Sequence, residues 1–466
     1  MATDLLLEPD VIDAVLAVAV ANGADFAEIF VEDTRSTTTT MDQRRVEDLM
    51  SNRSRGAGVR VIVGSTTGYA HTADLSLAGL LAAAEAARSV AQRQSGGATV
   101  VAVGAAQVHA MRAEIEPSSV DRARRIEVLR AADDIARSHG GAISQVQLSI
   151  ADNSRRILVA NSLGLLSTDH QVRSRLNVSC VASGDTGMQT GRATLAATAG
   201  FELFAPERVA ETANNAARQA ITKMSARPAP SGDFPIVLAN GFGGVLFHEA
   251  CGHGLEADAI VKKTSIYADR VGELVASELV TLVDDGTCDG EWGAIAIDDE
   301  GAPASRNVLI ENGVLTDYMW DYVRATQEGR ASSGNGRRQT YQDLPMVRMT
   351  NTFLETRDAT PDQIIADTPY GVYVAALGGG QVDTSTGDFV FGMTEAYLIE
   401  NGEITAPLRE ANLVGNGPDV LARVDAVAND FAMAPGTCGK WGQQVPVGSG
   451  QPTMRLTGMT VGGTAA

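Results

Sequence analysis

The hexapeptide His248-Glu-Ala-Cys-Gly-His253 contains two of the six histidines of this 466-residue chain. Histidine offers a neutral nitrogen that binds zinc, and a glutamate beside the metal can accept the proton of a metal-bound water. These are the residue types of a catalytic zinc site, with His248 and His253 as candidate ligands and Glu249 as candidate base. The four remaining histidines are expected at ordinary surface or core positions: His71, His109, His139 and His170.

The spacing of the two histidines is unusual for a shared metal ion. Five residues along a regular α-helix leave two side chains roughly 140° apart, whereas four residues leave them roughly 40° apart. The rings can converge only if the turn widens, as in a π-helical turn, or if the helix breaks. Gly252 and Gly254 make either distortion less costly because glycine has no Cβ. We therefore predict an irregular helical turn over Ala250–Gly254.

A third ligand is needed, and three residues compete for the role. Cys251 lies three residues after the first histidine, a spacing that suits a regular helix. Glu256 lies three residues after the second histidine and offers a carboxylate. Cys438 lies between glycines that leave room for a metal, and the nearby Lys440 would lower the pKa of its thiol. Either cysteine could instead be a small buried apolar side chain, and these arguments rank Cys438 and Glu256 similarly.

Length and composition limit the class of protein. A chain of 466 residues is expected to form two or three domains. Hydrophobic residues make up 44 % and charged residues 20 % of the chain, which excludes wholesale disorder. The 48 glycines and the aromatic content of 5 % indicate many turns and a large β component.

Charge and hydrophobicity patterns limit the partners and the compartment. The net charge of −20 argues against binding nucleic acid or anionic lipid over a broad surface. No apolar stretch reaches the ~18 residues of a membrane helix, and the short run Val11–Ala21 has no basic residue before it, so a secretory signal is not expected. The four cysteines are far apart and are expected as thiols. We therefore expect a cytoplasmic protein.

The pattern of elements predicts an α+β fold with two domains. Residues 1–227 form an N-terminal domain of helices and antiparallel strands, in which 1–95 and 116–227 could be two related units because each contains a helix, several strands and a helix. The breaker-rich segment Pro228–Gly232 is the expected linker. Residues 233–466 form a mostly antiparallel β domain with one metal-binding helix. Its hairpins are expected at the Asn-Gly pairs of residues 312–313 and 401–402.

Several other motifs have structural explanations. Asp152-Asn-Ser154 is a candidate hairpin turn. Gly378-Gly-Gly380 is expected to be a turn, and a groove that admits an extended peptide is the alternative. Arg337 and Arg338 are expected to be a solvated pair, and the alternative is that one of them meets a peptide carboxylate. The tryptophans are expected to pack in a core or an interface: Trp292, Trp320 and Trp441.

The segment His248–Glu256 resembles the signature of the TldD branch of the TldD/PmbA family of metalloproteases. The resemblance covers roughly Asp233 to the end of the chain, and the N-terminal half resembles the family in the order of its helices and strands. Further matching motifs are Ile297–Pro303, Asn307–Gly313, Gly334–Arg338, Leu344–Asn351, Gly378–Asp383, Cys438–Pro446, Gly448–Thr453 and Thr460–Thr464.

The resemblance implies a ligand set and an activity. It implies a zinc ion on His248, His253 and Cys438, with Glu249 as the base. Cys251 departs from the family, in which the matching position is apolar. The resemblance further implies hydrolysis of short or unfolded peptides in an enclosed site, and a PmbA-like (TldE) partner subunit that lacks the metal motif; a homo-oligomer is the alternative.

Two other functions compete with a zinc peptidase. A cysteine peptidase that uses Cys438 and a histidine would be inhibited by alkylation and indifferent to chelators. A non-enzymatic regulator or scaffold subunit is the second, because the family has also carried the label of a gyrase modulator. The nitrogen and sulfur ligands favour zinc over other ions without excluding iron.

Overall fold

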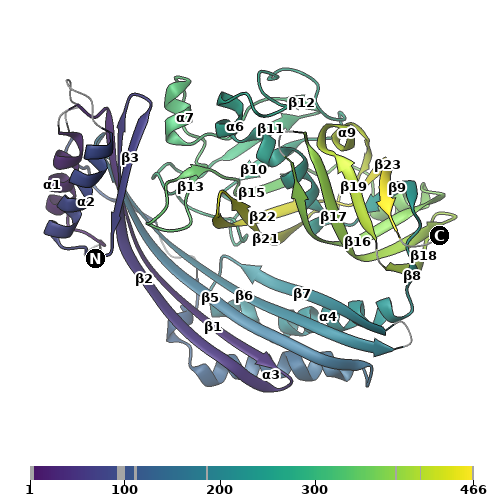
Figure 1. Cartoon of the computed structure of the whole chain (residues 1–466). Helices are drawn as coiled ribbons and strands as arrows, with labels where there is room; N and C mark the ends of the chain where they lie inside the picture. The colour runs from purple at the N-terminus through teal and green to yellow at the C-terminus, as the bar shows by residue number, and fades with distance from the viewer. Residues whose placement is uncertain are drawn as a thin grey trace.

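The structure is a computed structural model that describes residues 5–21, 23–91, 100–109, 113–184, 187–383, 386–409 and 411–463. One long, curved sheet forms the N-terminal half, and the C-terminal half lies over the concave side of this sheet (Figure 1). Helices and antiparallel strands occur in both halves, which confirms the predicted α+β class. The predicted domain limits and the relation between units 1–95 and 116–227 stay predictions, and residue 95 lies outside the described residues.

The N-terminal sheet has seven strands in the order β3-β2-β1-β5-β6-β4, with β7 also paired to β6. Their bounds are β1 Phe26–Asp42, β2 Arg45–Val63, β3 Thr66–Thr72, β4 Gln107–Val108, β5 Ile143–Asn161, β6 Leu166–Gly184 and β7 Gly187–Ala197. The hairpin turn predicted at Asp152–Ser154 is wrong, because these residues pair with β1 on one side and β6 on the other. Backbone pairing on both edges overrides the local turn propensity.

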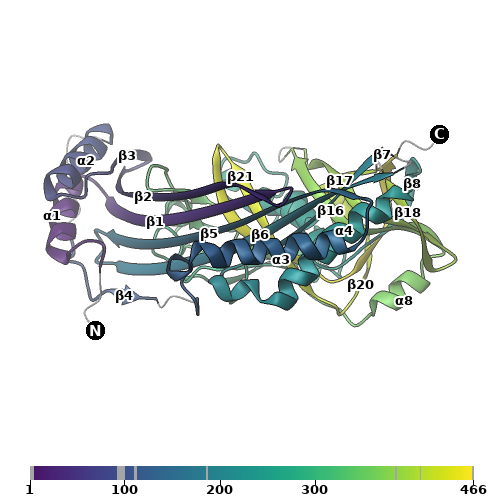
Figure 2. The ribbon, with the colours of Figure 1, turned by 90° about the horizontal axis from the view of Figure 1, so that it is seen from below.

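Four helices cover this sheet. Helices α1 (Pro9–Val20) and α2 (Leu77–Val90) lie at one end, and α3 (Arg122–Ser138) and α4 (Pro206–Met224) run along its outer face (Figure 2). Single 3-10 turns precede the last two, at Pro117–Ser119 and Phe201–Phe204. Side chains of β6 alternate between the two faces of the sheet. The apolar side chains of Val172, Leu176 and Val178 lie on one face and are buried. The other face carries polar side chains: Gln171, Arg173, Arg175 and Asn177. The sheet therefore presents a polar concave face.

The C-terminal half contains two larger sheets and one short pair, β13-β14. The eight-stranded sheet has the order β16-β9-β23-β19-β17-β18-β8, with β20 beside β23, and pairing of β16 with β17 closes a ring. The six-stranded sheet has the order β12-β11-β10-β15-β22-β21. The strand bounds are β8 Arg227–Pro228, β9 Gly232–Leu238, β10 Leu282–Asp285, β11 Arg306–Glu311, β12 Val314–Leu315, β13 Gly336–Arg337, β14 Met346–Val347, β15 Asn351–Leu354, β16 Tyr370–Val382, β17 Asp388–Glu400, β18 Glu403–Arg409, β19 Asn412–Asn416, β20 Val424–Val427, β21 Ala432–Lys440, β22 Gln443–Gln451 and β23 Met454–Gly462.

Short helices connect these strands: η3 Phe242–Gly244, α5 Val245–Phe247, η4 His248–Gly252, η5 His253–Leu255, α6 Ala257–Val261, α7 Tyr322–Gln327, α8 Pro361–Ala366 and α9 Gly417–Ala422. Both predicted Asn-Gly hairpins are confirmed. Asn312 and Asn401 have φ values of 47° and 55°, and the glycine after each also has a positive φ. Each pair links adjacent antiparallel strands, β11 to β12 and β17 to β18.

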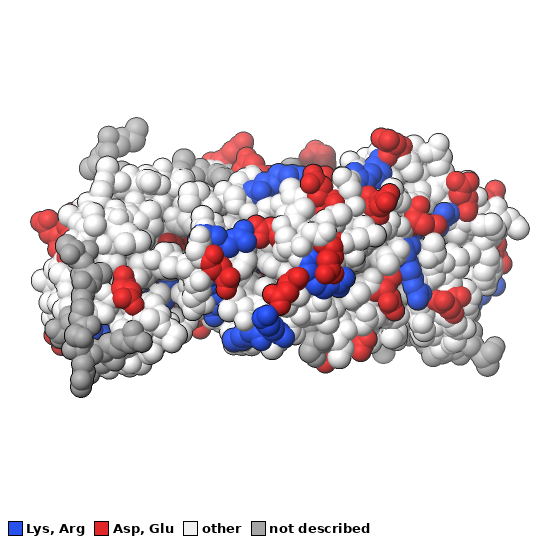
Figure 3. Space-filling view, turned by 90° about the horizontal axis from the view of Figure 1, so that it is seen from above, with Lys and Arg blue, Asp and Glu red and all other residues white. Residues whose placement is uncertain are grey.

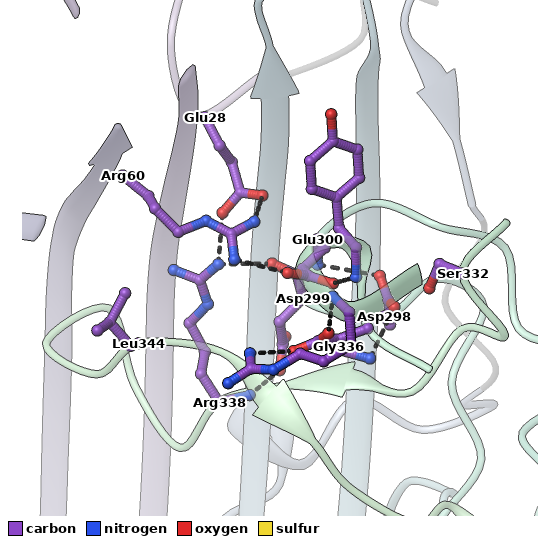
Figure 4. Close-up of polar contacts among 12 residues, drawn as sticks. Glu28, Arg60, Asp298, Asp299, Glu300, Ser332, Gly336, Arg338 and Leu344 are labelled. Carbon is purple, nitrogen blue, oxygen red and sulfur yellow. Dashed lines mark hydrogen bonds and ion pairs between the residues drawn. The ribbon is translucent and has the colours of Figure 1, made fainter. Parts of the chain in front are cut away.

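A buried ion network joins the two halves (Figure 4). Arg60 on β2 contacts Glu28 on β1 at 2.7 Å and Glu300 of the C-terminal half at 2.6 Å, and Arg338 contacts Glu28 at 2.6 Å. The prediction that Arg337 and Arg338 form a solvated pair is wrong, because their exposed fractions are 3 % and 1 %. For Arg338, the acidic partner Glu28 lies far away in the sequence.

The face seen from above in Figure 3 carries acidic and basic side chains side by side, without a broad area of either sign. Among the helices of the described residues, none is long and apolar enough to cross a membrane.

Candidate metal centre

The histidine motif adopts the widened turn that its spacing requires. Residues His248–Gly252 form a π-helical turn, in which the backbone N–H of His253 donates to the carbonyl of His248, an i→i+5 hydrogen bond. The two imidazole rings therefore come within 5.0 Å of each other, centroid to centroid. The predicted irregular turn is confirmed, although it begins two residues earlier than expected. A Cβ at Gly252 would overlap Sδ of Met349, so a larger residue there would force this buried methionine to move.

The turn and strand β21 bring three potential ligands together. One ligand atom from each of His248, His253 and Cys438 lies within 4.8 Å of the others, and Sγ of Cys438 is 3.3 Å from Nε2 of His253. Zinc bonds of about 2.0–2.3 Å place tetrahedral ligand atoms roughly 3.3–3.8 Å apart, so a small inward movement would complete the site. Nδ1 of His248 is buried without a hydrogen-bond partner among the described residues. The donor set of two imidazoles and one thiol fits a zinc ion with one open position.

The electrostatic environment favours a thiolate. Burial alone would raise the pKa of Cys438, but the neighbouring His248 and His253 lower it to about 4. The pKa of His253 lies well above its usual value, since Glu256 and Cys438 outweigh the opposing effect of burial. A thiolate is the form of cysteine that binds metals.

Glu256 supports the cluster from behind His253. Its Oε2 lies 3.0 Å from Nδ1 of His253, on the side of the ring opposite Cys438. The ammonium of Lys440 donates to Glu256 at 2.9 Å and to Asp258 at 2.8 Å. Despite its burial, Glu256 has a pKa lowered to about 2 by Lys440 and His253. This carboxylate therefore orients the imidazole, as outer carboxylates do in zinc sites.

Cys251, the other candidate ligand, lies in the hydrophobic core. Its Sγ lies 3.2 Å from the carbonyl of Phe247, and burial raises the pKa of the thiol. The remaining histidines stay apart from the cluster, and His71 and His139 are exposed. The structure thus brings together the three ligands that the resemblance implies and separates Cys251 from them.

A cavity of about 790 Å³ opens onto the cluster. Glu249 is half-buried and lines this cavity together with His253 and Cys438. Trp441 is 66 % exposed and lines the cavity, so it lies outside the core, and its expected place in an interface stays a prediction. Its position three residues after Cys438 was the sequence signal that could have placed it beside the cavity.

The glycine run at 378–380 is part of strand β16, so its prediction as a turn is wrong. The strand continues through bulges because β17 supplies pairing partners up to Val382. Gly380 lines the same cavity as the metal cluster. The alternative expectation, that this run borders a groove, therefore agrees with its position.

Three protein-family models match successive segments of the chain. They describe PmbA/TldA metallopeptidase domain 1 (residues 27–91), the central domain (115–224) and the C-terminal domain (231–463). The chain belongs to the PmbA/TldD metallopeptidase family. A Metalloprotease TldD homolog of Haemophilus influenzae is 37 % identical, with 94 % of this chain and 93 % of that protein covered. A Metalloprotease of Methanothermobacter thermautotrophicus is 36 % identical, with 94 % and 96 % covered.

Solved structures share the fold. A Thermotoga maritima protein described as a candidate modulator of a DNA gyrase superposes with a TM-score of 0.80 at 20 % identity, covering 97 % of this chain and 99 % of that one. TldE from Thermococcus kodakarensis superposes with a TM-score of 0.76 at 19 % identity, covering 97 % and 99 %. A Saccharolobus solfataricus relative, 32 % identical with 53 % of this chain and 56 % of that protein covered, is named a zinc metalloprotease TldD homolog.

Proposed function

We propose that this protein is a zinc-dependent peptidase that hydrolyses short or unfolded peptides. The observation that supports it most directly is the cluster of His248, His253 and Cys438, whose ligand atoms lie within 4.8 Å of one another, beside a cavity that His253, Cys438 and Glu249 line. The names of the relatives agree with this class of enzyme.

Each residue has a role in the proposed reaction. His248, His253 and Cys438 would hold the metal, and a bound zinc would supply Lewis-acid polarisation of the peptide carbonyl and of water. Glu249 would take a proton from the attacking water and deliver it to the leaving amine. Glu256 would keep Nε2 of His253 directed at the metal.

The edge of a sheet is available to hold the substrate. Strand β21 is the last strand of the six-stranded sheet among the described strands, and its residues 437–440 line the cavity. Residue Gly439 of this strand is exposed, and a side chain there would meet no atom within 4 Å. An extended peptide could pair with this edge, which would give affinity with little sequence preference.

We further propose that the chain functions in a complex with a TldE-like partner subunit, with a homo-oligomer as the alternative. The shared fold with TldE of Thermococcus kodakarensis supports this proposal. Light scattering of the chain alone and with a TldE-like protein distinguishes the two assemblies.

One observation favours a second candidate, a cysteine peptidase. Sγ of Cys438 lies 3.3 Å from Nε2 of His253, and its thiol has a pKa of about 4, as in a thiolate–imidazolium pair. In such an enzyme, the buried His248 and the half-buried Glu249 would have no role in catalysis. Chelation separates the two candidates, because only the zinc peptidase would lose activity with 1,10-phenanthroline and regain it with zinc.

The first experiment is the metal content of purified protein by elemental mass spectrometry. We expect about one zinc per chain in the unaltered protein and its loss in Cys438→Ala. Cys251→Ala is the matched control and should keep the metal. Zinc retained by Cys438→Ala and lost by Cys251→Ala would overturn the proposed ligand set.

The second experiment is cleavage of a fluorogenic peptide library, with and without a TldE-like partner. Glu249→Gln should keep zinc and lose at least about a hundredfold in rate, because general-base catalysis contributes about 10²–10⁴-fold. Unchanged cleavage by zinc-loaded Glu249→Gln would remove Glu249 from the mechanism. Unchanged cleavage by metal-free protein would contradict the zinc peptidase itself.

A further inference from the structure

A second cavity of about 430 Å³ is lined by residues of strands β1, β2, β5 and β6 and by residues of the C-terminal half. Thr437 lines both cavities, so this one begins one residue from the proposed ligand Cys438. The chain as a whole has a net charge of −20, yet the ionisable residues that line this cavity are one glutamate and four arginines: Glu32, Arg155, Arg173, Arg337 and Arg338.

Two of the four arginines have carboxylate partners. Arg155 donates to Glu32 at 3.2 Å and to Asp299 at 2.9 Å. Arg338 donates to Glu28 at 2.6 Å, within the network of Figure 4. One nitrogen of Arg155, Nη2, is nevertheless buried without a partner among the described residues.

The other two arginines have only neutral partners in the part of the chain that the structure describes. Arg173 donates to the side chain of Gln171 and to the carbonyls of Trp292 and Ala294, each at 2.9 Å. Arg337 donates to the carbonyl of Met349 at 2.6 Å. Arg173 and Arg337 are both at least 95 % buried, and buried cations usually have an anionic partner.

The surroundings leave these charges under-compensated. Burial first, and then the neighbouring Arg337 and Arg155, lower the pKa of Arg173 to about 9. Burial also lowers the pKa of Arg337 to about 10, although Asp299 acts in the opposite direction. Arginine stays protonated in proteins, so the lowered pKa values report a free-energy cost that a bound anion would relieve.

We propose that this cavity is a subsite for a carboxylate of the peptide substrate, held by Arg337 and Arg173. This inference rests on the proposed peptidase function, since Thr437 lines both this cavity and the metal cavity and so places the two side by side. A guanidinium presents paired N–H donors that match the two oxygens of a carboxylate. The carboxylate is either the C-terminus of the peptide or an acidic side chain.

The test measures binding without turnover. In the Glu249→Gln background, fluorescence anisotropy compares three octapeptides of alanine, valine and glutamine with an N-terminal fluorescein. One ends in a free carboxylate, one is amidated, and one is amidated with a single internal glutamate. We expect amidation of the C-terminus to weaken binding at least about tenfold, because it removes a charge-assisted hydrogen bond.

The third peptide identifies the source of the carboxylate. If the internal glutamate restores affinity, the subsite accepts acidic side chains. If only the peptide with the free carboxylate binds tightly, the subsite recognises the C-terminus of the peptide. Equal affinity of all three peptides for the Glu249→Gln protein would overturn the proposal before any arginine is changed.

Variants then locate the effect. Arg337→Gln should abolish the preference for a carboxylate, whereas Arg337→Lys should keep part of it. Asn153→Asp places a negative charge in the same cavity without removing a buried arginine, and should reduce the preference as well. Arg192→Gln is the matched control, because Arg192 is exposed on the same sheet and lines a different cavity. A preference that survives both Arg337→Gln and Asn153→Asp would place the carboxylate elsewhere.

This outcome is separable from the peptidase proposal. Cleavage of amidated and free peptides at equal rates, with equal affinities, would remove the subsite and leave the peptidase standing. Carboxylate-dependent binding by protein that holds zinc but never cleaves would remove the peptidase and leave an anion-binding site.

Discussion

Oε2 of Glu256 lies between two cationic groups, 3.0 Å from Nδ1 of His253 and 2.9 Å from Nζ of Lys440. A hydrogen bond at Nδ1 fixes the orientation of the imidazole and directs its Nε2 toward Cys438. Glu256, which competed with Cys438 for the role of third ligand, thus lies behind His253, where it would orient this proposed ligand toward the metal.

Glu256→Gln should weaken zinc binding about 10–100-fold, the usual effect of losing an outer carboxylate. The affinity is measured by competition with a chromogenic chelator at pH 7. Glu278→Gln is the control, since Glu278 is exposed and outside the cluster. Equal zinc affinity of the two variants would show that Glu256 does not orient the site.

Lys440→Gln should destabilise the protein, because Glu256 and Asp258 would lose the ammonium that both contact. Removing one partner of a buried ion pair costs about 3–5 kcal/mol, and the free energy of unfolding from urea titration of metal-free protein measures it. Asp258→Asn in the same chain should recover part of the loss, since the pKa of Asp258 is raised by burial. No change in stability would mean that water replaces the ammonium.

Much of the proposed metal site could be predicted from local sequence. The i,i+5 spacing of His248 and His253 dictates a widened turn, and Gly252 permits it because no Cβ would fit beside Met349. Cys438 lies 185 residues after His253, so its proposed role came from a family resemblance rather than from local physics. The choice between Cys438 and Glu256 depends on which face of His253 each approaches, and only the tertiary structure contains that information.

Long-range pairing explains the parts of the fold that the sequence did not predict. Asp152–Ser154 has turn composition but lies in the middle of a 19-residue strand, since β1 and β6 pair with it on both sides. Arg337 and Arg338 have the composition of a surface pair, yet Glu28, more than 300 residues earlier, helps to bury one of them. Local composition carries no signal for partners at such separations.

Gly252→Ala should impair both folding and zinc binding. The added methyl group would overlap Sδ of Met349, and overpacking of a buried site typically costs about 1–3 kcal/mol. Thermal unfolding and zinc titration measure the two effects. Gly141→Ala is the matched control, because a Cβ there would meet no atom within 4 Å. Met349→Ala combined with Gly252→Ala should restore part of the lost stability and zinc affinity. Normal zinc affinity in Gly252→Ala alone would show that the turn tolerates a side chain.

The interface between the two halves should depend on pH through Glu300. Burial first, and then the nearby Asp321 and Glu28, raise the pKa of Glu300 to about 7, against the opposing effect of Arg60. Between its ordinary value of 4.5 and about 7 the folded state holds a proton that the unfolded state has released. Its contribution to stability is therefore complete below pH 4.5 and is lost as the pH rises through 7.

Glu300→Gln should remove this dependence, because glutamine stays neutral at every pH. The free energy of unfolding of metal-free protein, measured between pH 5 and pH 8, should fall less steeply with pH in Glu300→Gln than in the unaltered chain. The difference in slope should approach about 1.4 kcal/mol per pH unit for one proton. Glu403→Gln, an exposed site on β18, should keep the original slope. Parallel curves for Glu300→Gln and the unaltered chain would show that Glu300 is ionised in the folded protein and that its contacts with Arg60 and the backbone N–H of Tyr322 offset the cost of burial.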